Sequence, residues 1–261
     1  PTAVIAGLGI LAVGLPLSIV MRHKPEQYGM LPDGQKTAAR ETSKVNESPN
    51  QPLEPNQKPA NNKEDTEASY GMIEALGTPV FWFLAIVFGL RQLIIGAIGL
   101  HQVPFLIDIG IAPQMAATVL GMTAITSILG RLGFGWLADR IPKRFVMAST
   151  ICLAALGAFI LANVTEWWQL IFFVLVYGIG WGGGATLMTV VRAEYFGRKA
   201  FGTISGMMDF VQMFGLVLGP VFAGFVYDLT KSYYIAFMIF AISGILASAM
   251  MVFLKPPVKV K

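Results

Sequence analysis

Seven long apolar blocks constrain the fold of this chain more than any other feature of its sequence. Each is close to the roughly 20 residues that a helix needs to cross the bilayer core, whereas barrel strands alternate in character and cross with about 10. Only 13% of the 261 residues are charged, against roughly 25% in soluble domains. We therefore predict an all-α membrane protein with spans near residues 3–21, 79–100, 113–137, 145–163, 168–191, 202–226 and 233–254.

A polar segment separates the first apolar block from the other six. Residues 32–69 contain five prolines and many Asn, Gln, Lys and Glu side chains. Such a segment cannot bury enough apolar surface to offset its chain entropy, so we predict that it is disordered. The predicted parts are a first helix at 1–21, a loop at 22–78, a six-helix bundle at 79–254 and a tail at 255–261. Because the chain starts in an apolar run without a signal peptide, we expect it to belong to a longer protein.

Lysines and arginines are unequally distributed over the two ends of the spans. Sixteen of the 19 flank one set of ends, which includes the long loop and the C-terminal tail, whereas only Lys231 flanks the other. Cytoplasmic loops carry such an excess of basic residues, so we expect the long loop and the C-terminus to be cytoplasmic. The same distribution explains the net charge of +4 without a nucleic-acid partner.

Glycines in the apolar blocks favour close helix packing. The run from Gly178 to Gly184 contains a G-x-G-x-x-G pattern, but a dinucleotide site needs a preceding strand, which an apolar helix does not provide. Small residues let helix backbones approach closely in a membrane, and the pairs Gly202/Gly206 and Gly215/Gly219 have the spacing for it. Pro220 follows the last of these glycines and predicts a kink.

Side chains that carry catalytic or metal chemistry are few. Cys152 is the only cysteine, so an internal disulfide is excluded, and the two histidines, His23 and His101, are far apart. Neither a metal-ligand set nor a nucleophile with a nearby base can be recognised. We expect no enzymatic activity, no cofactor and no bound metal.

A dense charge cluster follows the third span, with the sequence Gly-Phe-Gly-Trp-Leu-Ala-Asp-Arg-Ile-Pro-Lys-Arg over residues 133–144. It resembles the signature loop of the major facilitator superfamily, which joins that family's eighth and ninth helices. Residues 194–198 and 219–228 resemble two later stretches of the family in the same order. The resemblance implies the last helix of an N-terminal half, a central loop and a complete six-helix C-terminal half. It also implies a cytoplasmic gate formed by Gly135, Asp139, Arg140, Arg144, Glu194 and Arg198.

Arg91 is the most informative charge inside a span, because it lies near the middle of its block. An Arg at that depth costs roughly 2.5–3.5 kcal/mol on insertion scales, so we expect it to face a cavity or a partner. With the adjacent Gln92, it is a candidate for binding an anion, because a guanidinium matches a carboxylate with two parallel hydrogen bonds. An ion pair that fixes helix packing is the alternative.

Further polar groups lie nearer the ends of the spans. Arg131 and Asp209 lie at similar depths and could pair across neighbouring helices, either as a coupling device or as a static contact, with Gln212 one turn from Asp209. We count Arg131 and Gln212 among the substrate-binding candidates and Asp209 among the coupling candidates. His101 can titrate near neutral pH, so it is a second coupling candidate, with a plain interfacial role as the alternative.

A narrower resemblance concerns the substrate. Residues 22–34, 101–110 and 194–202 are similar to stretches of bacterial monocarboxylate transporters and oxalate–formate antiporters. In the monocarboxylate branch, an Arg at the place of Arg131 is implicated in carboxylate binding, although Ser127 stands here where that branch has an acid. The antiporter branch uses a Lys in its eleventh helix, and Asp209 is the only charge between residues 202 and 226.

These observations predict a secondary active transporter with alternating access. We expect its substrate to be a small organic anion such as a monocarboxylate, moved by proton symport or by exchange for another anion. A drug or organic-solute exporter of the same superfamily is the alternative, and a membrane receptor or scaffold without transport is a third. The expected partners are the substrate, a proton or exchanged anion, the lipid bilayer and the missing N-terminal half, in a bacterial inner membrane.

Overall fold

The computed structural model describes residues 70–197 and 199–257. The predicted first helix at 1–21, most of the predicted loop at 22–78, Arg198 and the last four residues of the tail lie outside the described residues.

The described part of the chain is helical, without a strand. A short helix, α2 (Met72–Leu76), precedes six long ones, and a 3₁₀ turn, η3 (Trp167–Gln169), leads into the fourth of these. All six are long and apolar enough to cross a membrane, which confirms the predicted fold class. The long helices are α3 (Pro79–Asp108), α4 (Pro113–Ala138), α5 (Lys143–Ala162), α6 (Leu170–Phe196), α7 (Phe201–Thr230) and α8 (Tyr234–Phe253).

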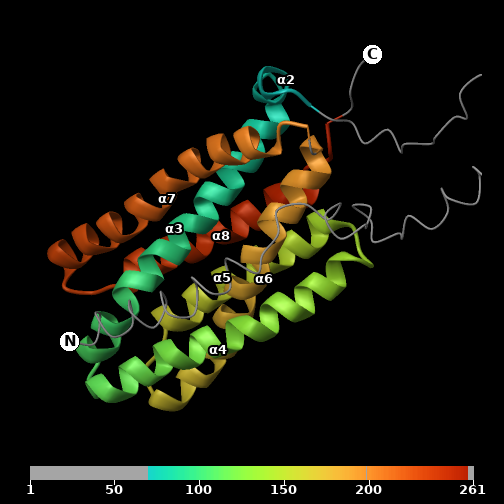
Figure 1. Ribbon diagram of the computed structural model, residues 1–261. Coiled ribbons are helices and arrows are strands. Elements are labelled where there is room, and N and C mark those ends of the chain that lie inside the picture. Colours follow the sequence, from blue (N-terminus) through green and yellow to red (C-terminus); the bar gives the residue numbers. More distant parts are fainter. Residues whose placement is uncertain (1–69, 198, 258–261) are drawn as a thin grey trace, which may run out of the picture. The chain divides into compact units, whose positions relative to one another are not determined.

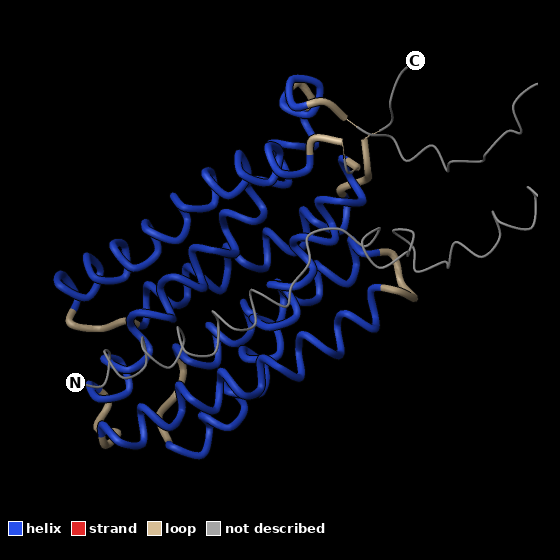
Figure 2. The backbone as a smooth tube through the Cα atoms, viewed as in Figure 1, coloured by secondary structure: helices blue, strands red, loops and turns tan. Residues whose placement is uncertain are grey.

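Successive long helices run in opposite directions, so their connections gather at two ends of the bundle (Figure 1, Figure 2). We call the end with residues 139–142 and 197–200 the basic end, and the end with residues 109–112, 163–166 and 231–233 the opposite end. Contacts at the basic end join elements that are distant in sequence. The backbone N–H of Tyr70 donates to the Phe196 carbonyl at 3.0 Å, and the Tyr195 hydroxyl donates to the Leu254 carbonyl at 2.8 Å.

Local sequence explains where several helices begin and end. Thr78 caps α3 by accepting the Phe81 N–H on its side chain, and Pro79 in the first turn needs no N–H partner there. Gly197 ends α6 with φ at 72°, a conformation that glycine adopts without steric cost. Helix α6 continues to Phe196, beyond the predicted membrane span at 168–191, so Arg192, one of the basic residues counted at the ends of the spans, is a helical residue.

The α3–α7 contact depends on glycines. A Cβ built on Gly215 would overlap the Gly89 carbonyl, and one on Gly219 would overlap the Leu93 carbonyl. The predicted small-residue contact at this pair is therefore confirmed. At Gly202 and Gly206, by contrast, an added Cβ would meet no described atom within 4 Å, so the predicted contact at that pair is not found within this bundle.

The glycine run of α6 packs in the same way against α4. Added Cβ atoms at Gly178 and Gly182 would overlap Thr126 and the Ser127 carbonyl of α4. The Thr126 hydroxyl also donates to the Val174 carbonyl of α6 at 2.9 Å. The run thus serves helix packing, as predicted, and such close backbone approach is the usual route to association in a bilayer.

Two buried apolar clusters fill the bundle, one toward each end. Along α3, the cluster at the basic end reaches Phe88 and the cluster at the opposite end starts at Ile94. Along α6, the corresponding limits are Leu187 and Tyr177. The layer between the clusters contains Arg91 and the glycine run of α6, so the middle of the bundle is the place where its packing is interrupted by a charge.

The substitution Gly215→Ala is expected to destabilise the bundle. The new methyl group would overlap backbone atoms of α3, which cannot move aside like the end of a flexible side chain, and such overpacking costs roughly 1–3 kcal/mol. We expect a melting temperature lowered by several degrees for the full-length protein in detergent. Gly206→Ala in the same helix is the matched control and should leave the melting temperature unchanged or raise it, since Ala is the better helix former. Equal melting temperatures for the two variants would contradict this account.

Candidate functional site

Arg91 is buried in the layer between the two apolar clusters, with 2% of its surface exposed. Its Nη2 donates to the Trp181 carbonyl of α6 at 2.9 Å. Its Nη1 donates to Gln92 Oε1 at 3.0 Å and lies 3.4 Å from Met188 Sδ. These partners are all uncharged, and the buried Nε has no partner in the described part of the chain.

Gly184 provides the space for this guanidinium. A Cβ built on Gly184 would lie 2.5 Å from Arg91 Nε, so any side chain there would displace the charged group. Trp181, Gly184 and Met188 follow one another at helical spacing and therefore lie on one face of α6. Arg91 of α3 thus occupies a recess whose floor is the backbone of α6.

A buried cation without a counter-ion is an unusual arrangement. Ionised groups within membrane proteins are expensive to bury and are usually paired or exposed to a water-filled cavity. Residues 70–197 and 199–257 include no ion pair to Arg91. The predicted alternative, an ion pair that fixes helix packing, therefore has no acidic partner in the part that the structure describes.

The structure brings only one other predicted binding residue to Arg91, namely Gln92. Arg131 is exposed on α4, and no hydrogen bond or ion pair that the structure describes joins it to the Arg91 site. Gln212 is buried on α7, where its amide donates to the Met208 carbonyl at 3.1 Å and to Asp209 Oδ1 at 3.2 Å. The binding roles of Arg131 and Gln212 stay predictions.

Asp209 pairs with Arg192, not with Arg131 as considered from the sequence. Arg192 Nη2 donates to Asp209 Oδ1 at 2.6 Å. Helices α6 and α7 are joined by only residues 197–200, so the two side chains belong to one antiparallel hairpin. Arg192 is a residue that sequence reasoning missed, because its place near the end of an apolar block grouped it with the basic loop residues.

His101 connects three elements near the opposite end. Its Nε2 lies 3.0 Å from the Pro220 carbonyl of α7, and its Nδ1 lies 3.2 Å from the Tyr233 hydroxyl. A carbonyl can only accept, so Nε2 carries the proton in this bond. Nδ1 is then the unprotonated nitrogen and can accept from the Tyr233 hydroxyl. The geometry describes an interhelical link, and a coupling role for His101 stays a prediction.

The predicted gate residues lie at the basic end, with varied partners. Glu194, near the end of α6, pairs with Lys143 at the start of α5 at 2.9 Å. The Arg140 guanidinium lies 3.6 Å from the centre of the Trp136 ring, a cation–π contact. Asp139, the C-cap of α4, is exposed and forms no ion pair that the structure describes. The other members of the set are Gly135 at the end of α4, Arg144 against Phe145, and Arg198, which lies outside the described residues.

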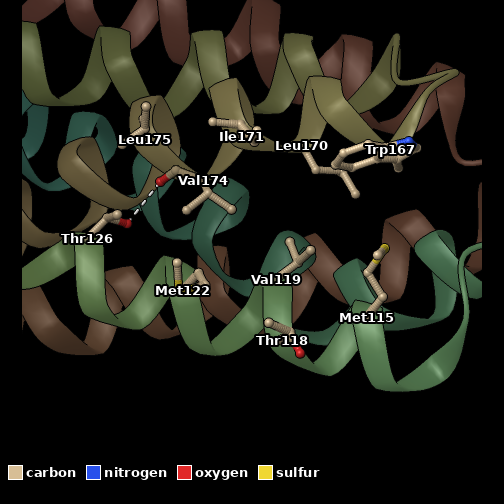
Figure 3. Close-up of a pocket in the computed structure, with 10 residues that line it drawn as sticks. All are labelled: Met115, Thr118, Val119, Met122, Thr126, Trp167, Leu170, Ile171, Val174 and Leu175. Atoms are coloured by element: carbon tan, nitrogen blue, oxygen red, sulfur yellow. Dashed lines mark hydrogen bonds between the residues drawn. The ribbon is translucent and has the colours of Figure 1, made fainter.

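A separate pocket of 230 Å³ opens between α4 and η3–α6 toward the opposite end (Figure 3). Its lining is almost wholly apolar and includes none of the predicted site residues. The only hydrogen bond drawn between lining residues joins Thr126 to the Val174 carbonyl (Figure 3). The lining residues are Met115, Thr118, Val119, Met122, Thr126, Trp167, Leu170, Ile171, Val174 and Leu175.

The sequence of this chain is similar to a known protein family and to several named transporters. Residues 68–261 match a family model described as Major Facilitator Superfamily. Monocarboxylate transporter 7 of Homo sapiens is 29% identical over 161 residues, which cover 60% of this chain and 31% of the relative. Monocarboxylate transporter 12 of Rattus norvegicus is 28% identical over 159 residues, or 59% of this chain and 33% of the relative.

A plant protein is similar over a shorter stretch. The protein named "Probable inorganic phosphate transporter 1-7" of Arabidopsis thaliana is 31% identical over 117 residues, or 42% of this chain and 22% of the relative. This chain therefore spans about a third or less of the length of each of these relatives.

Proposed function

Because this chain belongs to the major facilitator superfamily, with three quarters of its length matched, we propose that it forms the C-terminal half of a secondary active transporter. Membership in this family and the six apolar helices make it an integral, multi-pass membrane protein and not an enzyme. In the proposed mechanism the substrate binds near the bilayer midplane, and access alternates as one helical half rocks against the other.

The proposed substrate is a small organic anion such as a monocarboxylate. The observation that carries this proposal is the buried guanidinium of Arg91, which has no described counter-ion and has an unused Nε donor. An anion that reached Arg91 would gain a charge-assisted hydrogen bond and would neutralise a charge that is costly to bury. Two of the similar relatives are named for monocarboxylates and one for inorganic phosphate. Both kinds of molecule are anions, which supports the proposed substrate class.

One observation favours the alternative of an exporter for organic solutes. The pocket between α4 and α6 is apolar and presents no charge, which suits an uncharged or weakly polar molecule. It lies apart from Arg91, however, and its lining would face lipid or another helical half in the assembled protein. A receptor or scaffold without transport is disfavoured by the family.

The proposal also concerns the driving force of transport and the orientation of the protein in the membrane. Transport would be driven by proton symport or by exchange for another anion, with Asp209 and His101 as the coupling candidates. In this proposal an N-terminal half of the transporter would supply the other wall of the binding site, and the basic end would face the cytoplasm, following the excess of Lys and Arg there. We also propose that the protein is related to the oxalate–formate antiporters and that it lies in a bacterial inner membrane.

Arg91→Gln is expected to lower the uptake of labelled carboxylates at least about tenfold, because it removes the charge that the anion would neutralise. The measurement is uptake by the full-length protein in proteoliposomes, with a panel of carboxylates. Arg131→Gln in parallel tests the second binding candidate, and Lys231→Gln, at the opposite end, is the control that should transport normally. Carboxylate uptake that both Arg variants leave intact would rule out the anion site.

The cytoplasmic gate is proposed to act through Asp139 at the C-terminus of α4. An acidic side chain there can pair with a nearby Arg or with the N-terminus of another helix. Contacts of this kind, when they form in one state only, bias the equilibrium between outward-open and inward-open states. Arg140, Arg144, Glu194 and Arg198 would contribute to the same latch.

Asp139→Asn is expected to shift this equilibrium toward the inward-open state. Cysteines introduced on the cytoplasmic side of the cavity should then react faster with a membrane-impermeant thiol reagent, by about threefold or more. Glu166→Gln, an exposed acid at the opposite end, serves as the control. Unchanged labelling together with normal uptake by Asp139→Asn would remove the latch proposal.

A further inference from the structure

A second buried cation lies one helical turn beyond the Arg91 recess. Trp181, Gly184 and Met188 hold the Arg91 guanidinium, and Arg192 follows Met188 by four residues on the same face of α6. Four residues of helix rise about 6 Å. The two guanidinium groups therefore form a row along α6 that leads from the middle of the bundle to the basic end.

Phe88 of α3 links the two positions. It lies one turn before Arg91 on α3, and the Arg192 guanidinium lies 5.7 Å from the centre of its ring. Arg192 is 5% exposed, so it is nearly as well shielded from solvent as Arg91. Unlike Arg91, it has a described counter-ion.

The ion pair between Arg192 and its counter-ion, Asp209, is exposed on the Asp209 side and uses only one nitrogen of the guanidinium. The side chain of Asp209 is 60% exposed, whereas that of Arg192 is 7% exposed. Only Arg192 Nη2 bonds to the carboxylate, and the buried Nε has no described partner. A carboxylate that used both donors would form the two parallel bonds that make guanidinium–carboxylate pairs strong.

The face of α7 around Asp209 offers further polar groups. Ser205 lies one turn before Asp209, and its buried hydroxyl has no partner in the described part of the chain. Gln212 lies almost one turn after Asp209 and donates to the same Oδ1 atom at 3.2 Å. If Asp209 swings out toward solvent, it releases the Arg192 Nη2 donor and one N–H of the Gln212 amide, whose Nε2 still donates to the Met208 carbonyl at 3.1 Å.

We propose that Arg192 is a second anion position, which Asp209 occupies when no substrate is present and from which a substrate carboxylate displaces it. This inference rests on the proposed transport of small organic anions. The substrate would pass from Arg91 to Arg192 on its way to the basic end, and Asp209 would then return and release it. A buried guanidinium without a counter-ion is unfavourable, and Arg192 is the buried member of the pair, so Asp209 would leave as another anion arrives.

Asp209→Asn is the most informative variant, because it removes the internal competitor and keeps the shape. We expect the KM for carboxylate uptake to fall about threefold to tenfold, and the maximal rate to fall as well, because nothing then displaces the anion from Arg192. Arg192→Gln should raise the KM about tenfold. Arg192→Lys keeps the positive charge but loses the paired N–H donors of the guanidinium, so its KM should lie between those of Arg192→Gln and the wild type. The matched control is Asp228→Asn, an exposed acid at the other end of α7, with unchanged kinetics.

All variants are measured with the full-length protein in proteoliposomes, beside Arg91→Gln, after their melting temperatures have been compared. If Arg91→Gln impairs uptake while Asp209→Asn and Arg192→Lys both keep the wild-type KM and maximal rate, the Arg192–Asp209 pair is a static contact and this inference is wrong. If the wild-type protein takes up no carboxylate at all, the proposed function fails and this inference fails with it.

Discussion

The burial of the Arg91 guanidinium between α3 and α6 is the constraint on which the middle of this bundle depends. Its neighbours are uncharged, and the recess exists because Gly184 has no side chain. The two apolar clusters stop on either side of this layer. An apolar side chain of similar size would be expected to stabilise such a site, because replacing a buried charge by well-packed hydrophobic groups is often neutral or stabilising. The anion binding that we propose would give this charge a role other than folding.

The packing around this layer is close at two pairs of helices. Glycines bring α7 against α3 and α6 against α4 so closely that backbone meets backbone. Helices α4 and α7, on the other hand, expose many large apolar side chains, among them Ile125, Leu129, Phe210 and Phe214. In the proposed transporter these faces would meet lipid and the N-terminal half. In that proposal the six-helix bundle would rock as one body, and the proposed movement of Asp209 would occur at its basic end.

Sequence reasoning predicted the six spans of the bundle because apolar blocks of this length leave no other solution in a membrane. It also predicted the packing role of Gly215, Gly219 and the α6 glycines, and it identified Arg91 from its depth. It missed Arg192, because a basic residue near the end of an apolar block looks like a loop residue. Gly197 was the available signal, since a glycine just beyond a helix commonly marks its end.

Other features could not be predicted from depth along a span. Arg131 and Asp209 lie at similar depths, but depth does not tell which helices are neighbours. The short connection between α6 and α7 made Arg192 the nearer partner for Asp209, since consecutive elements are usually adjacent. The fit between Gly184 and Arg91 needed the three-dimensional structure, because it depends on the rotation of two helices about their own axes.

Calorimetric titration of the purified full-length protein with a small carboxylate, and with the uncharged amide of the same acid, shows whether the Arg91 guanidinium binds a negative ligand. We expect the wild-type protein to bind the carboxylate at least about tenfold more tightly than the amide, or about 1.4 kcal/mol, and we expect Arg91→Met to lose this difference. Equal affinities for the two ligands, or an undiminished preference in Arg91→Met, would show that Arg91 does not bind the anion.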